Sequence, residues 1–192
     1  MKSKNLLLSL FLLSAAVQLY VPAQMILSKE DVLKTGKEFR FKTRPIDPND
    51  PFRGKYITLF FEENSFLLDR TAEWKNPSEF YVVVVEDAFG FAQIAYVTEE
   101  EPAGTQDYFL ASTSSSISNE QGTTLFIDFP FSKYFMEESK AQEAEVAVWE
   151  SHSDSTQSTY AVVAVKEGDS ALKNVFINGT PINKVVQERM KQ

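Results

Sequence analysis

The residues best suited to chemistry lie in one segment, 44–62, which is rich in proline and charge. Asp47 and Asp50 could supply oxygen ligands to a hard cation, but known calcium loops use more ligands at wider spacing and end on a glutamate. We therefore expect the two aspartates to accept hydrogen bonds from turn amides, with Arg53 paired to one of them. A binding role for the segment is the alternative, and neither a metal nor a cofactor is expected.

A serine, histidine and aspartate site would have to use His152, the only histidine in the chain. It lies in the polar segment 151–155, which we expect to be a loop after a helix. A catalytic serine also needs a tight turn and an oxyanion hole, and the chain contains no G-x-S-x-G sequence. The sequence therefore does not favour this class of hydrolase.

Two other catalytic pairings are conceivable. A serine and lysine pair would need Ser65, or a serine from 112–118, beside a buried lysine, and nothing in the sequence selects a pair. Acidic pairs on an expected helix are typical of a solvated face. These candidates are Glu137 with Glu138 and Glu143 with Glu145. We expect no enzymatic activity, and an envelope hydrolase with a Ser/Lys or carboxylate pair remains the alternative.

Composition narrows the classes of function. The chain has 192 residues and a formal charge of -8, and such an acidic body repels nucleic acid, so we expect no nucleic-acid partner. It has no cysteine, which excludes disulfides, thiolate metal sites and cysteine nucleophiles. The length suits one domain with one core.

The N-terminal residues 1–27 are expected to form a membrane anchor. Lys2 and Lys4 precede an apolar run, 5–27, that carries no charge and is long enough for the roughly 20 residues that a spanning helix needs. Basic residues before the run and acids after it orient the N-terminus toward the cytoplasm. We expect a single-pass protein of the inner membrane with its C-terminal domain in the periplasm.

A cleavable signal peptide is the alternative for this segment. Small residues around Pro22 would allow cleavage before Gln24 and give a secreted or periplasmic protein. We favour a retained anchor because a proline beside the cut is unfavourable and the apolar run continues to Leu27.

The remaining elements follow from hydrophobic periodicity. Residues 28–36 are expected to form a short linker helix and 37–192 a single β-rich domain. Period-two or continuously apolar runs predict strands. The expected strands are 38–43, 56–61, 80–86, 91–98, 107–111, 123–129, 160–166 and 171–177. The one helix of the domain is expected at 136–151, with 64–77 as a loop or poor helix and 112–121 as a flexible connection.

This pattern predicts a mainly β (α+β) fold. We expect an antiparallel sheet, sandwich or barrel-like domain with one principal helix, joined to an N-terminal transmembrane helix. The 16 phenylalanines are expected to pack between sheets. Binding of a hydrophobic small molecule in a Phe-lined cavity is the alternative use for them.

The segment 54–61, GKYITLFF, resembles the signature of the GDYXXLXY family of membrane-anchored proteins. The similarity extends to 133–135, 171–173 and 178–179. Lys55 stands where the family has an acid, and Phe61 replaces its final tyrosine. The residues of the motif segment that could serve interaction are Arg44, Asp47, Asp50, Arg53, Gly54, Tyr56, Leu59 and Phe61.

The resemblance implies an anchored, envelope-facing protein and supplies no activity. It also implies a multi-spanning integral membrane protein as partner. We therefore expect a non-enzymatic accessory or interaction protein, with the proline-rich segment as a structural collar or a docking surface.

Overall fold

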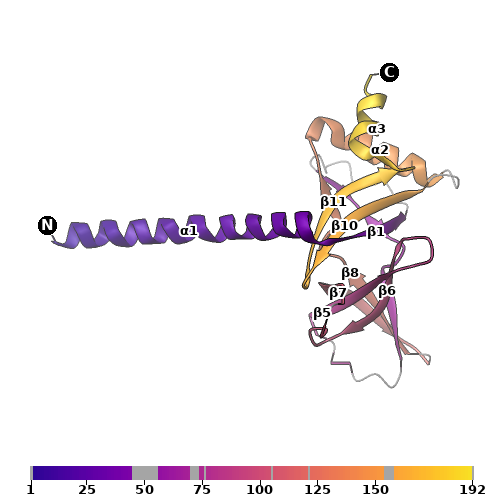
Figure 1. The fold of residues 1–192 in the computed structure, drawn as a ribbon, viewed down its shortest axis with the longest axis horizontal. Coiled ribbons are helices and arrows are strands. Elements are labelled where there is room, and N and C mark those ends of the chain that lie inside the picture. The colour runs from indigo at the N-terminus through magenta and orange to yellow at the C-terminus, as the bar shows by residue number, and fades with distance from the viewer. Residues whose placement is uncertain are drawn as a thin grey trace.

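The computed structural model describes residues 2–44, 56–69, 74–75, 77–104, 106–120, 122–153 and 158–191. It consists of one long N-terminal helix, α1 (Lys2–Thr35), and a β-rich domain from which that helix projects (Figure 1). The prolines of the motif segment, Pro45, Pro48 and Pro51, and the candidate site residues Asp47, Asp50, Arg53 and Gly54 lie outside the described residues.

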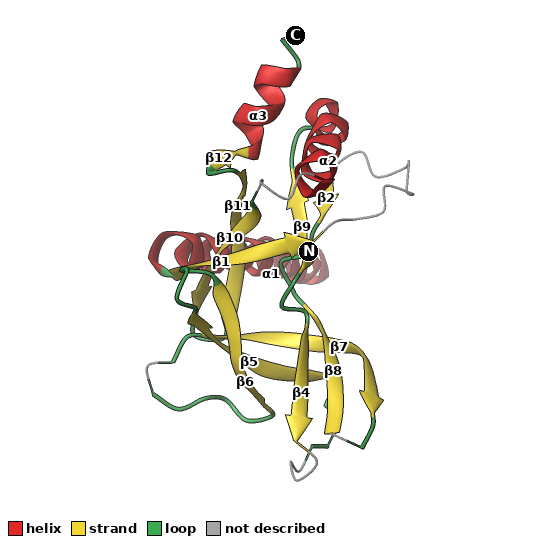
Figure 2. Ribbon diagram, turned by 90° about the vertical axis from the view of Figure 1, so that its right-hand side faces the viewer, coloured by secondary structure: helices red, strands yellow, loops and turns green. Residues whose placement is uncertain are grey.

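The domain is built from antiparallel sheets and is about 45% strand, with a nearly closed, barrel-like arrangement, as the sequence predicts. The first sheet has the order β12-β11-β10-β1-β3 and the second β4-β8-β7-β5-β6 (Figure 2). The first sheet contains β1 (Lys37–Arg44), β3 (Phe60–Phe61), β10 (Thr159–Lys166), β11 (Asp169–Ile177) and β12 (Thr180–Pro181). The second contains β4 (Ser65–Asp69), β5 (Glu79–Glu86), β6 (Ala92–Thr98), β7 (Tyr108–Ser118) and β8 (Gly122–Asp128).

Smaller elements complete the domain. β2 (Tyr56–Thr58) and β9 (Lys133–Phe135) form a two-stranded sheet of their own. The expected helix is α2 (Glu138–Ser153), and a further helix that the sequence analysis did not foresee, α3 (Ile182–Arg189), packs beside it. The buried side chains of α3 are Ile182 and Val186, so it has only a narrow apolar stripe to signal a helix.

Several strands follow their sequence pattern closely. In β1 the side chains of Phe39 and Phe41 are buried while Arg40 is exposed, the alternation expected of a half-buried strand. The expected hairpins are present as β5 with β6 and β10 with β11. Asn178 and Gly179 have φ of 52° and 76°, the left-handed conformation that a tight turn requires.

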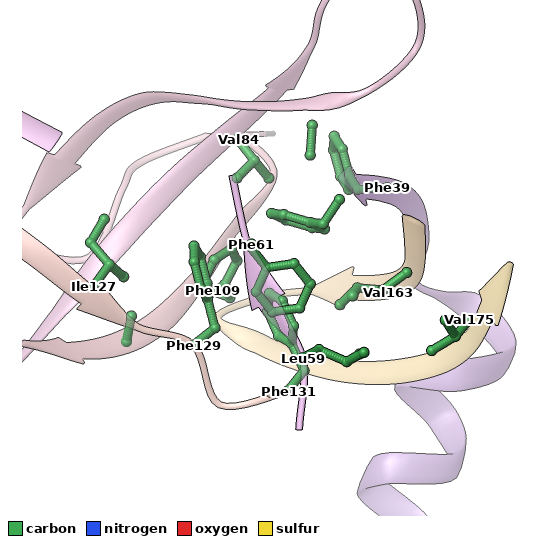
Figure 3. Close-up of a cluster of buried hydrophobic side chains, with 14 of the residues drawn as sticks. Phe39, Leu59, Phe61, Val84, Phe109, Ile127, Phe129, Phe131, Val163 and Val175 are labelled. Carbon is green, nitrogen blue, oxygen red and sulfur yellow. The ribbon is translucent and has the colours of Figure 1, made fainter. Parts of the chain in front are cut away.

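The core lies between the two large sheets and is dominated by aromatic rings (Figure 3). The ring of Phe41 lies 5.7 Å from that of Phe61 and 5.1 Å from that of Phe131, and Phe109 lies 5.2 Å from Phe131. Most of these contacts are tilted or edge to face, the arrangement that aromatic rings prefer. Packing between sheets is thus the use of these phenylalanines, as expected.

The predicted single strand 56–61 is wrong in detail. The chain changes partner at Leu59, so that Ile57 pairs with Tyr134 of β9 and Phe61 pairs with Thr43 of β1. At the break, the Leu59 N–H donates to the Ser132 carbonyl at 2.8 Å. The uninterrupted apolar pattern hides this break because both halves are buried.

Three connections also differ from expectation. Ser65–Asp69, expected to be a loop or poor helix, forms β4 on the edge of the second sheet. The polar run after Ala111, expected to be flexible, continues β7 to Ser118 because its backbone pairs with β8 while exposed side chains face solvent. Residues 28–35, expected as a separate linker helix, continue α1 without a break.

The helix α1 is long and apolar enough to cross a membrane, judged by length and composition over Leu6–Thr35. None of its apolar window is buried inside the structure, and a signal sequence near an N-terminus has the same properties. The structure therefore agrees with either an anchor or a leader.

Candidate functional site

The motif segment borders a surface groove of about 590 Å³ where the first sheet passes into the second. This volume is in the range of small-molecule sites. Arg44, Leu59 and Phe61 line one side, and Ser115, Ile117 and Asp128 from β7 and β8 line the other. Three of the predicted site residues thus meet at one surface feature.

Arg44 supplies the positive charge at the rim of this groove. Its guanidinium lies over the ring of Phe60 at 5.6 Å, a cation-π distance, and the two residues are also partners in the β1–β3 ladder. Asp128 provides a carboxylate among the other lining residues. The groove therefore combines an aromatic lining with charges of both signs.

Three of the described motif residues, Tyr56, Leu59 and Phe61, make packing contacts. Leu59 and Phe61 are buried in the core, and Phe61 contacts Phe129 at 5.2 Å between ring centroids. Tyr56 is not among the residues that line the groove: its ring lies 5.4 Å from that of Phe135, and the Lys133 ammonium lies 5.1 Å from its centroid. The four predicted interaction residues that the structure describes are therefore divided between the core, the groove and the small sheet.

The small sheet joins two stretches that are far apart in the sequence. Tyr56, Ile57 and Thr58 pair with Phe135, Tyr134 and Lys133. The Tyr134 hydroxyl donates to Asn174 Oδ1 at 3.1 Å and accepts from Asn183 at 3.1 Å, and burial raises the pKa of Tyr134. These bonds fix the small sheet to β11 and α3.

His152 is engaged with backbone and threonine groups. Its Nδ1 lies 2.7 Å from the Val148 carbonyl, and its Nε2 lies 2.9 Å from the Thr43 carbonyl and 3.1 Å from Thr43 Oγ1. The neighbouring Ser151 hydroxyl donates to the Val148 carbonyl at 2.6 Å. This histidine therefore ties α2 to β1, and Ser151 does not face it as a nucleophile would.

Of the acidic catalytic candidates, Glu137 is paired with Lys140 and Glu143 with Arg189. Among the described residues, the buried polar side chains are Thr43, Ser151, Thr159 and Ser170, so no serine there has a buried lysine beside it. On α2, Glu143 and Glu150 pair with Arg189 of α3. Within the described part of the chain, no group of three or more histidines and acids could hold a metal ion.

A second cluster of charged residues lies where α1 meets the domain, and no sequence pattern predicts it. Lys166 Nζ donates to Asp31 Oδ2 at 2.6 Å and to Thr35 Oγ1 at 2.9 Å, and Lys29 donates to Asp169. The hydrogen bond that Lys166 donates to the Asp31 carboxylate raises the pKa of Lys166. Val32, on the same turns of the helix, is buried. The end of α1 is therefore docked on β10 and β11.

Gly36 makes this docking possible. A Cβ at this position would lie 2.5 Å from the Val32 carbonyl oxygen and 3.1 Å from the Val165 carbonyl oxygen, both closer than ordinary contacts. The Gly36 N–H also donates to the Val32 carbonyl at 2.8 Å. Gly36 is thus the only residue between α1 and β1, and the connection is short and tightly packed.

Sequence reasoning identified one side of the groove through the motif but missed the other. Ser115 and Asp128 lie in β7 and β8 and carry no pattern that would relate them to Arg44. The junction residues Asp31 and Lys166 are 135 positions apart, so only the fold relates them.

Comparison with known proteins adds one match. A family model described as GDYXXLXY protein matches residues 18–175. No curated protein and no solved structure matches the chain.

Proposed function

Since the chain belongs to the GDYXXLXY protein family, we propose that it is a membrane-anchored interaction protein that works without catalysis beside a multi-spanning integral membrane protein. One observation carries this proposal. The apolar length of α1 is exposed along its sides, while its last turns are locked to a folded β domain.

The exposed apolar surface of α1 supports the anchor. Side chains such as Phe11 and Leu19 project freely, and Leu19 is 75% exposed. Burying apolar surface is worth roughly 25 cal/mol for each Å², so a helix of this length has a large gain from entering a bilayer. In Figure 1 the helix stands clear of the domain along most of its length.

The charges around α1 support a cytoplasmic N-terminus and a domain in the periplasm. Lys2 and Lys4 precede the apolar run. Among the lysines that follow it, Lys29 is paired with Asp169, Lys34 with Glu30 and Lys37 with Asp107. Basic residues are retained on the cytoplasmic side of inner-membrane helices.

The location can be tested on the full chain in its own membranes. We expect an intact N-terminus, resistance to extraction by alkaline carbonate, and digestion of the domain by protease added to the periplasmic side. A soluble form that begins at Gln24 would overturn the anchor in favour of a cleaved leader. Full-length protein in the cytosol would overturn the proposal.

The contacts of the catalytic candidates support a non-enzymatic role. His152 is hydrogen-bonded to Thr43 of β1 and Ser151 to Thr159 of β10, and Glu143 of α2 is paired with Arg189 of α3. The partner is tested by crosslinking in native membranes from several surface positions. A specific adduct with a multi-spanning protein is expected, and adducts with no membrane protein from any position would contradict the role.

The groove beside Arg44 favours a second candidate function, the binding of an amphipathic small molecule. Its lining combines Phe60 and Phe61 with Arg44. Native mass spectrometry of the detergent-purified chain should then detect a co-purifying ligand that Ile117→Arg removes. Leu67→Arg is the matched control, because Leu67 and Ile117 are similarly exposed, 51% and 57%, and Leu67 is not part of the lining. Equal ligand occupancy in both variants would refute this function.

A further inference from the structure

The turn between β5 and β6, residues 87–91, is a rigid tip. The Asp87 carboxylate accepts hydrogen bonds from the Phe89 and Phe91 N–H groups, both at 2.8 Å. The Asp87 N–H donates to the Phe91 carbonyl at 2.7 Å, and the Gly90 N–H donates to the Asp87 carbonyl at 3.1 Å. Gly90 has a φ of 78°, which the turn requires. Hydrogen bonds from Phe91 and then Phe89 lower the pKa of Asp87, so the carboxylate is charged near neutral pH.

This rigid tip presents a phenylalanine to solvent. Phe89 is 80% exposed, the highest fraction among the large apolar residues that the structure describes, the sides of α1 included. The next ring, Phe91, packs back on the domain with its centroid 5.9 Å from that of Tyr160. Phe89 therefore adds nothing to the core. An aromatic side chain held on a preordered turn is the type of residue that dominates binding interfaces.

The surroundings of Phe89 are acidic. Glu86 and Asp87 precede it in the hairpin, and Glu62 and Glu63 line a hollow of about 170 Å³ together with Asp87 and Phe91. Lys42 lines the same hollow, but its ammonium lies 4.6 Å from the Phe91 centroid. The turn that carries Phe89 and the hollow beside it therefore hold four carboxylates and one amine.

The tip lies away from the anchor. β1 leaves α1 at Lys37 and leads across the domain (Figure 1), and Lys42, which contacts Phe91, is five residues further along. At about 3.3 Å for each residue, these two positions are roughly 17 Å apart. Tyr160, the other neighbour of Phe91, pairs with Lys42 at the same end of the sheet.

We propose that the Phe89 tip, defined as Phe89 with Glu62, Glu63, Glu86 and Asp87, is a docking point for a protein that offers an apolar pocket rimmed by lysine or arginine. Charge complementarity selects this occupant. Anionic lipid and a second copy of this chain, whose net charge is -8, would both be repelled by the four acids. The periplasmic setting of the partner rests on the proposed function, whereas the chemistry of the surface does not.

The test uses the full chain in its native membranes. The photoreactive residue p-benzoylphenylalanine is placed at position 89 and, as a matched control, at position 135, where the natural phenylalanine is 69% exposed at the end of β9. We expect one discrete adduct from position 89 and none of that mass from position 135. Mass spectrometry of the joined peptide should map the contact to a protein segment that contains lysine or arginine.

Charge and ring variants separate specific docking from random capture. Glu62→Lys with Glu86→Lys should reduce the adduct at least tenfold, while Glu100→Lys at the far end of β6 should leave it unchanged. With the crosslinker moved to position 93, Phe89→Ala should reduce the adduct about tenfold and Phe89→Tyr should retain it. Circular dichroism confirms that each variant is folded.

Four results would overturn the inference: no adduct, a lipid adduct, an adduct of twice the chain mass, or an adduct that is insensitive to the charge reversals. Cell fractionation is scored separately. A soluble chain that still shows the charge-dependent adduct would refute the anchor and leave the docking surface standing.

Discussion

The substitution Gly36→Ala tests whether α1 is rigidly joined to the domain. The added methyl group would lie 2.5 Å from the Val32 carbonyl oxygen and 3.1 Å from that of Val165, so the helix end or β10 must move. Overpacking of this kind costs about 1–3 kcal/mol, and loss of the Gly36 to Val32 hydrogen bond about 1 kcal/mol more. The expected loss of unfolding free energy is therefore about 2–4 kcal/mol.

Urea unfolding of the detergent-solubilised chain measures this loss. With a slope of about 2 kcal/mol per molar urea, the midpoint should fall by about 1–2 M. The natural chain has no cysteine, so spin labels can be attached at Leu27→Cys and Leu67→Cys alone. The distance distribution between these labels should be narrow in the parent protein and broad after Gly36→Ala.

Gly179→Ala is the matched control. No atom lies within 4 Å of a Cβ at Gly179, so only its φ of 76° is unfavourable for alanine, at a cost of roughly 1–2 kcal/mol. This variant should lose stability but keep the narrow label distance. If Gly36→Ala shifts the midpoint by less than about 0.3 M and leaves the label distance narrow, the tight junction does not exist.

Three further predictions follow from side-chain contacts. Asp31→Asn and Lys166→Met should be non-additive in urea unfolding, because each removes the same ion pair, and full additivity would show that the pair does not couple helix to domain. Asp87 has a lowered pKa in the folded state, so the stability it contributes is present above its ordinary pKa of 3.8 and is lost as pH falls through the lowered value. Protection of the Phe89 and Phe91 amides, measured relative to their intrinsic exchange rates, should fall in that acid range, and constant protection would refute the assignment. The hydrogen bond to Glu101 raises the pKa of Tyr108 to about 12. Tyr108 therefore ionises first in the unfolded chain, and the fold should lose stability between about pH 10 and 12. Glu101→Gln should lower the pKa of Tyr108 in an ultraviolet titration.

Local pattern was sufficient for the elements that carry their own signal. The alternation around Phe39 and Phe41 indicated β1, and the β-branched run 80–86 before a glycine turn indicated the β5–β6 hairpin. In these segments the faces that the pattern makes apolar are the faces that the fold buries. Sequence reasoning therefore found the strands, the hairpins and the mainly β class.

Elements that depend on distant partners could not be read locally. The break at Leu59 exists because Ser132, in a connection after β8, supplies a carbonyl to its N–H group. The serine-rich half of β7 is a strand because β8 satisfies its backbone, although its side chains have little apolar character. The break at Leu59 and the length of β7 both depend on which distant segment pairs with the chain at that point.

The sequence likewise predicted only part of the candidate site. The motif residues Arg44, Leu59 and Phe61 meet at the groove, yet Leu59 and Phe61 also build the core, so their spacing reflects packing as much as recognition. Tyr56 lies in the small sheet formed by β2 and β9 instead. The sequence pattern predicts only a turn around Phe89 and does not indicate that this side chain is exposed.

The direct passage from α1 into β1 has a geometric consequence for any partner. A helix advances about 100° and 1.5 Å for each residue, and nothing between Leu27 and β1 can absorb a change of angle. Inserting a single alanine after Leu27 should thus turn the whole domain by about a quarter revolution around the axis of α1 relative to residues 2–27, and inserting seven should nearly restore its orientation. In the anchored protein proposed above, the number of residues between the bilayer and β1 would set the direction in which the domain faces a partner.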